Sequence, residues 1–358
     1  MKNYIKHNEW QIIEEGFDPD LNKISESIFS IGNGRMGQRA NFEETYTGET
    51  LQGNYVAGVY YPDKTRVGWW KNGYPEYFAK VLNATNWIGL TITINDEILD
   101  LNTGKVLEFS RVLDMKAGNL TRKFVVELKN GNILEVEAVR FCSIVDDEAG
   151  AIKYSITPQN FDGTISIESF LDGDVKNQDS NYEEKFWNEV TAKQEGDFAL
   201  LNLETKKTAF WVSSAICTNI YQDDKDLGLR PSFNKKEKYV AQQFEVEVKK
   251  NQTTTIYKYA VNLSSENYKK EELETTSITR LKAIVAKGFD KMLAEQTDAW
   301  AAKWQNGDVI IEGDVAAQQA IRFNIFQLHQ TYTGEDARLN IGPKGFTGEK
   351  YGGSTYWD

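Results

Sequence analysis

Hydrophobic and polar residues alternate with a period of two along much of the chain between about residues 88 and 263. Nine runs of this kind predict half-buried strands, and Asn130-Gly131 marks a hairpin turn between two of them. The runs are LTITINDEILDL, LTRKFVVELKNG, ILEVEAVRF, AIKYSITP, TISIESFL, FALLNLET, AFWVSSAI, AQQFEVEVK and TTTIYKYAVNL. Short strands separated by turn residues favour antiparallel pairing, and their number favours two packed sheets over one small barrel. We therefore predict a mainly β fold, a large antiparallel β-sandwich.

The pattern changes at Ser264, where apolar residues begin to recur at helical spacing. We predict two amphipathic helices, broken near Gly288 or slightly later, whose apolar stripe must pack on another part of the protein. The stripe consists of Leu281, Ile284, Val285, Phe289, Met292, Leu293, Trp300 and Trp304. A further helical run from Ala316 to about Thr333 places Ile321, Ile325 and Leu328 on one face.

These patterns divide the chain into a sandwich domain at 1–263, a helical linker at 264–306 and the beginning of a helical domain at 307–358. One helix cannot bury its apolar face alone, and the sequence ends on Tyr356-Trp357-Asp358. We therefore expect this sequence to be part of a longer protein.

Composition narrows the class of protein. The chain is 40% hydrophobic and 12% aromatic, which is typical of a globular protein with a substantial core. Its net charge of -12, with scattered basic residues, argues against a nucleic-acid partner. No apolar run resembles a signal peptide or a membrane span, so we expect no membrane association and a cytoplasmic location.

Few residues offer metal or thiol chemistry. Cys142 and Cys217 both lie in apolar strand-like runs, so we expect two buried free thiols. His7 and His329 are too few and too far apart to indicate a zinc site, and the sequence contains neither CxxC nor HExxH. We expect no metal.

Several other motifs invite a functional interpretation. The adjacent acids Glu43-Glu44, Asp146-Asp147-Glu148 and Asp223-Asp224 are expected to be solvated edges or turns without a catalytic role. The glycine-rich Phe29–Gly37 lacks the features of a nucleotide-binding loop. Arg66, Trp69, Trp70 and Lys71 suit a sugar-facing surface, a subunit-facing surface or a packed aromatic core.

Two long blocks carry a family resemblance. Residues 10–44 (WQIIEEGFDPDLNKISESIFSIGNGRMGQRANFEE) and 51–83 (LQGNYVAGVYYPDKTRVGWWKNGYPEYFAKVLN) resemble the N-terminal portion of maltose-phosphorylase-like members of glycoside hydrolase family 65. Residues 337–358 (ARLNIGPKGFTGEKYGGSTYWD) resemble the loop that follows the first barrel helices in that family. The resemblance implies a β-sandwich, a helical linker and an (α/α)6 catalytic barrel, of which this chain holds the beginning.

The resemblance also implies a reaction. Family members of this kind are inverting phosphorylases, in which phosphate attacks the anomeric carbon of an α-linked glucose disaccharide while a glutamic acid protonates the leaving oxygen. The resemblance implies that the intact protein converts maltose and phosphate to β-glucose 1-phosphate and glucose. That acid is expected downstream of Asp358, so we assign no catalytic residue here and expect the chain alone to be inactive. Inorganic phosphate is the co-substrate, no cofactor is implied, and a homodimer is expected.

The sequence is also compatible with other functions. They are a trehalose, kojibiose or nigerose phosphorylase, an inverting α-glucosidase, a non-catalytic carbohydrate-binding or assembly module, and a complete lectin-like sandwich.

Trp357 and Asp358 are the residues that the resemblance places against substrate, in the glucose pocket at subsite -1. An indole stacks on the apolar face of a pyranose, and a carboxylate accepts hydrogen bonds from adjacent hydroxyls. Alternatively, Trp357 packs on the barrel and Asp358 caps a following helix. Gly352-Gly353 would let the loop approach the sugar, or form a simple turn.

Overall fold

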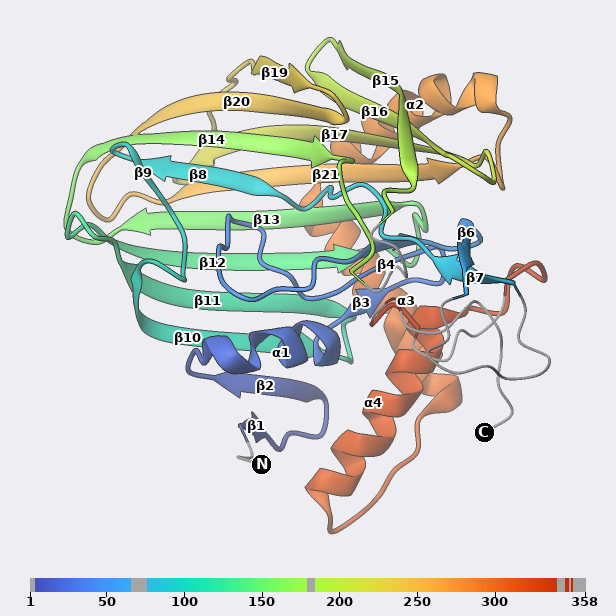
Figure 1. The fold of residues 1–358 in the computed structure, drawn as a ribbon. Coiled ribbons are helices and arrows are strands. Elements are labelled where there is room, and N and C mark those ends of the chain that lie inside the picture. Colours follow the sequence, from blue (N-terminus) through green and yellow to red (C-terminus); the bar gives the residue numbers. More distant parts are fainter. Residues whose placement is uncertain (1–3, 66–75, 179–183, 340–344, 348, 350–358) are drawn as a thin grey trace.

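The computed structural model describes residues 4–65, 76–178, 184–339, 345–347 and 349. Its main element is a large antiparallel sheet that runs across the whole molecule (Figure 1). The strands, in spatial order, are β1 (Ile5–Lys6), β2 (Gln11–Glu15), β10 (Lys105–Asp114), β11 (Asn119–Glu127), β12 (Ile133–Cys142), β13 (Ala149–Pro158), β21 (Thr254–Ser264), β17 (Trp211–Gln222), β16 (Phe198–Thr205) and β15 (Trp187–Glu195), with β18 (Lys225–Asp226) paired to β17.

Three smaller sheets accompany the large one. The five-stranded sheet has the order β19 (Ser232–Lys236), β20 (Tyr239–Val248), β14 (Gly163–Asp172), β8 (Leu90–Ile94) and β9 (Glu97–Ile98). A three-stranded sheet contains β3 (Ile31–Gly32), β4 (Met36–Gln38) and β5 (Asn54–Val56), and a hairpin contains β6 (Tyr60–Lys64) and β7 (Tyr77–Val81). Every ladder between these strands is antiparallel. The predicted mainly β, antiparallel class is confirmed.

All nine predicted runs form strands, and the turn at Asn130-Gly131 joins β11 to β12, with Gly131 at a φ of 84°. Two long strands escaped the sequence analysis for physical reasons. In β10, Arg111 is buried and interrupts the alternation. In β15, the register shifts between Glu189 and Thr191, and only Trp187 and Ala192 of the strand are buried.

The predicted helix pair covers one face of the large sheet. It consists of α2 (Leu273–Lys287) and α3 (Phe289–Gly307), separated by Gly288 at a φ of 79°. Leu281, Ile284 and Met292 pack against sheet residues such as Phe141. The apolar stripe is therefore buried, as predicted.

The last helix, α4 (Val315–Thr331), faces the sandwich with its polar side. Its buried side chains are Gln318, Gln319, Arg322, Phe326 and Gln330. The predicted apolar face is oriented differently, because Leu328 is 53% exposed and Ile321 and Ile325 are only partly buried.

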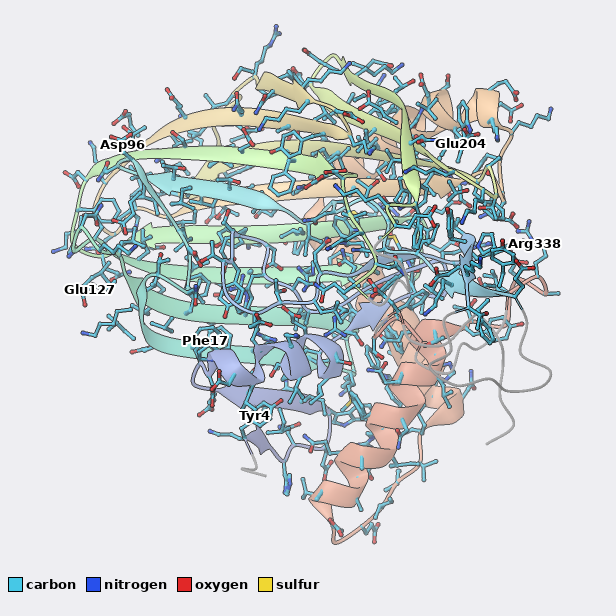
Figure 2. All side chains as sticks on the ribbon, viewed as in Figure 1. Tyr4, Phe17, Asp96, Glu127, Glu204 and Arg338 are labelled. Carbon is cyan, nitrogen blue, oxygen red and sulfur yellow. The ribbon has the colours of Figure 1, made fainter. Side chains whose placement is uncertain are left out.

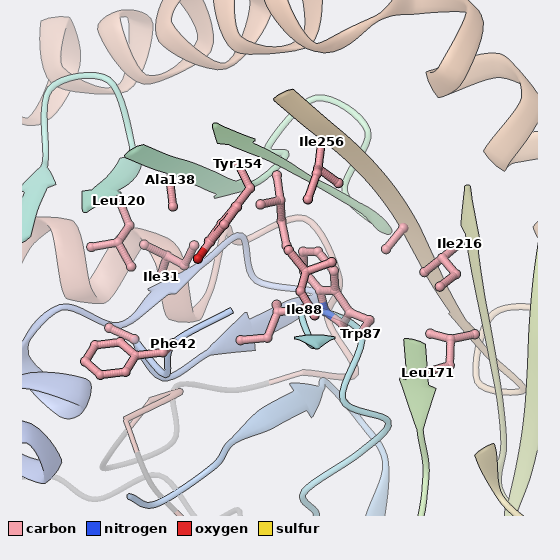
Figure 3. Packing of buried hydrophobic residues seen from close by; sticks show 14 of the residues in the cluster. Ile31, Phe42, Trp87, Ile88, Leu120, Ala138, Tyr154, Leu171, Ile216 and Ile256 are labelled. Atoms are coloured by element: carbon pink, nitrogen blue, oxygen red, sulfur yellow. The ribbon is translucent and has the colours of Figure 1, made fainter. Parts of the chain in front are cut away.

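The opposite face of the large sheet is covered by the five-stranded sheet and by residues 29–56, which we call the inner segment. This segment contains β3, β4 and β5 and is buried at 29–34, 36–44 and 53–55, whereas residues 45–52 are partly buried or exposed. Figure 3 shows Tyr154 of the large sheet reaching toward Ile31 of the inner segment. The two cysteines, Cys142 and Cys217, are buried free thiols, as predicted, and burial raises the pKa of each to about 12.

One cation lies within the sandwich without an acidic partner among its hydrogen bonds. Lys258 of β21 is fully buried, and its Nζ donates to the carbonyl oxygens of Gly89 (2.7 Å) and Phe170 (3.0 Å). Burial lowers the pKa of this amine well below its ordinary value. The folded state therefore binds fewer protons at this site than the unfolded chain does, over the pH range between the two pKa values.

We predict that the free energy of unfolding of the native chain rises, relative to that of Lys258→Met, as pH increases from neutrality toward the unfolded lysine pKa of about 10.4. Chemical denaturation at several pH values measures both. Lys235→Met, at an exposed position, is the control. A constant difference between the native chain and Lys258→Met across this range would contradict the assignment.

Candidate functional site

The residues expected to contact sugar, Trp357 and Asp358, lie outside the described residues, as do Gly352-Gly353 and the aromatic motif at 66–71. The structure describes α4 and, of the residues between α4 and Trp357, 332–339, 345–347 and 349. The candidate site therefore consists of the contacts that hold α4 and the described residues after it against the sandwich. That support begins in the inner segment.

Three arginines lie side by side on the inner face of the large sheet. Arg111, Arg122 and Arg140 come from the adjacent strands β10, β11 and β12, and each is at most 4% exposed. Arg111 and Arg122 are directly opposed in the strand register. Like charges at opposed positions destabilise a sheet, and a buried unpaired charge costs more, so this row requires acids.

Glu43 and Glu44 of the inner segment supply two of those acids. Arg122 donates to Glu44 Oε1 and to Glu43 Oε2, at 2.6 Å each, and Arg140 donates to Glu43 Oε1 at 2.6 Å. Tyr154 donates its hydroxyl to Glu44 Oε2 at 3.1 Å. The expectation that Glu43-Glu44 is a solvated edge or turn is wrong, because both are less than 5% exposed.

A second part of the same network ties the chain start to the inner segment. Glu14 lies opposite Arg111 in the register and forms an ion pair with it at 3.4 Å. Asn22 links the two halves, since it accepts from Arg111 (2.9 Å) and donates to Glu26 (3.1 Å). Glu26 in turn lies 3.7 Å from Arg39. Four arginines and four glutamates thus balance in charge within the interior.

The network keeps its central carboxylate ionised. Burial alone would raise the pKa of Glu43, but Arg140 and Arg122 more than offset it and lower that pKa. Burial would likewise lower the pKa of Arg122, but Glu44 and Glu43 reverse the shift. The group is a structural ion cluster that is closed to solvent. It offers no opening for a substrate.

The glycine-rich Phe29–Gly37 forms the β3–β4 hairpin. Asn33 Oδ1 accepts from the backbone N–H groups of Arg35 (3.0 Å) and Met36 (2.9 Å), and its Nδ2 donates to the Ser143 carbonyl (2.6 Å). Gly34, at a φ of 85°, donates its N–H to the carbonyl of Gln330 in α4 at 2.7 Å. The hairpin therefore binds other parts of the protein, and its loop connects the sandwich with α4.

Arg35 extends this connection beyond α4. Its guanidinium donates to Asp147 (3.0 Å) and to Asp336 (2.7 Å). Asp336 also accepts from Arg338, which lowers the pKa of the Asp336 carboxyl, and Arg338 donates to the Glu266 carbonyl at 2.6 Å. Residues 336–338 are therefore fixed to the sandwich from two sides.

A cavity of about 530 Å³ lies where these elements meet. The end of β5 and the β6–β7 hairpin line it, and Tyr60, Phe78 and Phe210 contribute aromatic surface. The C-terminal part of the chain contributes Thr331, Arg338, Leu339, Gly345 and Phe346. Figure 2 shows Arg338 beside the β6–β7 hairpin, at the end of the molecule where this cavity lies. Aromatic side chains together with Glu266 and Arg338 are a composition that suits a polar, ring-shaped ligand.

The remaining acid clusters have partners. Asp146 binds Lys287 at 2.5 Å, and Glu148 is 6% exposed and accepts from Tyr268 at 2.7 Å, so this group is less solvated than expected. Asp223-Asp224 forms a turn, as expected, with φ values of 48° and 63°.

Within the described ranges, His, Cys, Asp and Glu side chains form no group of three that could hold a metal ion. No helix in the same part of the chain is long and apolar enough to cross a membrane.

The sequence of the chain matches a known class of carbohydrate-active protein. Residues 12–303 match the glycosyl hydrolase family 65 N-terminal domain, and residues 322–358 match the family's central catalytic domain. The chain belongs to glycosyl hydrolase family 65.

Relatives of this chain include several phosphorylases. Maltose phosphorylase of Bacillus subtilis is 40% identical over 98% of the chain and 46% of its own length. Alpha,alpha-trehalose phosphorylase and kojibiose phosphorylase of Thermoanaerobacter brockii are 33% and 30% identical, over 98% and 100% of the chain and 46% of their own lengths.

A solved structure titled as a putative kojibiose phosphorylase from human microbiome superposes with a TM-score of 0.89. It is 30% identical, and the match covers 99% of this chain and 46% of that one. The chain thus spans about half the length of the relatives it matches.

No local pattern in the sequence predicts the contacts made by Arg35, Asp336 and Phe346. The one feature that could have indicated them is that FSIGNGRM and IGPKGF both combine glycines with aromatic and charged residues. The two segments are about 310 residues apart in the sequence. Only the fold shows that Phe346 meets Gly32 and Gly37.

We predict that Glu43→Gln lowers the free energy of unfolding by about 3 to 5 kcal/mol, because it leaves a buried positive charge without compensation. Glu137→Gln is the matched control, since Glu137 pairs with Lys123 at 2.7 Å but both side chains are about half exposed. Its effect should stay below about 1 kcal/mol. Equal effects of the two substitutions in denaturant titrations would contradict the structural importance of the buried network.

Proposed function

We propose that the whole protein is an inverting disaccharide phosphorylase that acts on maltose. In this reaction a phosphate oxygen bonds to the anomeric carbon as the glycosidic bond breaks, and a glutamic acid gives its proton to the leaving oxygen. The products are β-glucose 1-phosphate and glucose. No cofactor takes part, and phosphate is a co-substrate.

The observation that supports maltose is the order of identities among the relatives. Maltose phosphorylase of Bacillus subtilis is 40% identical, against 33% and 30% for the trehalose and kojibiose phosphorylases of Thermoanaerobacter brockii. Each comparison covers nearly the whole chain, so the three identities refer to nearly the same residues of this protein. The general acid is expected beyond Asp358, and the polypeptide of residues 1–358 is therefore proposed to be inactive alone.

Within this proposal, Trp357 and Asp358 bind the glucose ring that is transferred. The indole provides a stacking surface, and the carboxylate accepts from two hydroxyls, which fixes the orientation of the ring. Both residues bind substrate and neither supplies the proton. Residues 1–263 form the sandwich, 264–306 the linker and 307–358 the beginning of an (α/α)6 barrel, in a cytoplasmic homodimer.

We predict that the whole protein releases glucose from maltose only when phosphate is present, with one β-glucose 1-phosphate formed for each glucose. Product assays with and without phosphate measure this, and kojibiose, trehalose and nigerose tested in parallel define the linkage. Glucose release that is unaffected by phosphate would instead indicate an inverting α-glucosidase. Faster phosphorolysis of another disaccharide would reject maltose while retaining the reaction type.

A further inference from the structure

Two glycines face each other across the smallest sheet. Gly32 of β3 and Gly37 of β4 are directly opposed in the register, and opposed residues in an antiparallel pair point to the same face. Because neither carries a side chain, the sheet has a slot at this point. Neither glycine has a positive φ, so backbone conformation does not explain them.

Phe346 occupies this slot. A methyl group at Gly32 would lie 2.7 Å from Phe346 Cδ2, and one at Gly37 would overlap the same ring at Cγ. The ring also stacks on Tyr55 of β5, with centroids 6.4 Å apart and planes inclined by 18°, and Phe346 is only 7% exposed. All three strands of this sheet therefore contact one aromatic ring from the catalytic-domain segment.

The residues next to Phe346 are held as well. The carbonyl oxygen of Thr347 accepts from Arg39 Nη1 and from Ser27 Oγ (3.4 Å). Arg39 is itself fixed, because it donates to the carbonyl oxygens of Leu51 and Lys23, at 2.8 Å each. Arg39 belongs to the buried ion network, so the position of this loop depends on the charges inside the sandwich.

We propose that Phe346 is a positioning residue: its ring, seated between Gly32 and Gly37, fixes where the chain enters the sugar site. This inference rests on the proposed function, because Trp357 and Asp358 follow eleven and twelve residues later in the sequence. Through this contact the sandwich orients the residues that bind substrate, although Gly32, Gly37 and Phe346 do not bind substrate themselves. Small displacements of a binding group are sufficient to reduce catalysis by about 100-fold.

Steady-state kinetics of the whole protein test this with Phe346→Ala, Gly37→Ala and the double variant. Each single substitution should raise the KM for maltose at least about ten-fold, with a smaller change in kcat, since contacts shared by ground and transition state act on KM. The combined effect in the double variant should be smaller than the sum of the two single effects, because Gly37→Ala acts mainly on the ring that Phe346→Ala removes, and only the β-carbon retained at position 346 must still shift. Phe233→Ala, at a half-buried phenylalanine of β19, is the control and should stay within about two-fold of wild type.

A KM for Phe346→Ala within two-fold of wild type would overturn the inference, as would fully additive effects in the double variant. If truncation to alanine prevents folding, Phe346→Leu keeps apolar bulk and should show an intermediate KM; an unchanged KM overturns the inference here too.

If the wild-type protein shows no phosphorolysis, the proposed function fails by itself. Hydrogen exchange then tests the contact of Phe346 with the sheet: the amides of 345–347 should exchange at least about ten-fold faster in Phe346→Ala than in Phe233→Ala, and equal rates would overturn the inference.

Discussion

The buried row of Arg111, Arg122 and Arg140 sets the condition that the rest of the structure satisfies. Three guanidinium groups on adjacent strands repel one another, and the interior cannot solvate them. Acidic side chains from outside the large sheet must therefore lie against the face that carries these arginines. Glu43 and Glu44 do so, and they bring with them the inner segment, which has little regular secondary structure to hold it in place. Electrostatic compensation, more than strand pairing, fixes this part of the chain.

The inner segment in turn supports the catalytic-domain segment. One side of it meets the arginines, and the other side meets α4 and the residues that follow. Gly34 binds the end of α4, Arg35 binds Asp336, and the slot at Gly37 receives Phe346. A chain of contacts thus runs from the core of the sandwich to the segment that carries the proposed sugar-binding residues. The polar face of α4 fits the same role, since amide side chains dock onto backbone carbonyls of the N-terminal region.

The periodicity of the sequence was sufficient to predict most helices and strands, but it did not predict the buried polar network. The nine alternating runs and the stripe on α2 and α3 were predictable because burial repeats there with a fixed period. Glu43-Glu44 was misjudged because acids are almost always exposed unless paired, and the paired arginines lie about 80 to 100 residues away. β10 was missed for the same reason, through Arg111. Trp357 and Asp358 came from family resemblance alone, and the contact of Phe346 with Gly37 depends on strand register that no local pattern reveals.

The central claim is that the buried charges make the inner segment as stable as the sheet beneath it. Native-state hydrogen exchange tests this most directly, because it reports the opening free energy of individual amides. We expect amides in the buried stretches of the inner segment, residues 36–44 and 53–55, to open only with global unfolding, at the same free energy as those of β11 and β12. Opening of these amides at a free energy several kcal/mol below that of β11 and β12 would contradict this, because it would show that the charge network does not hold the segment.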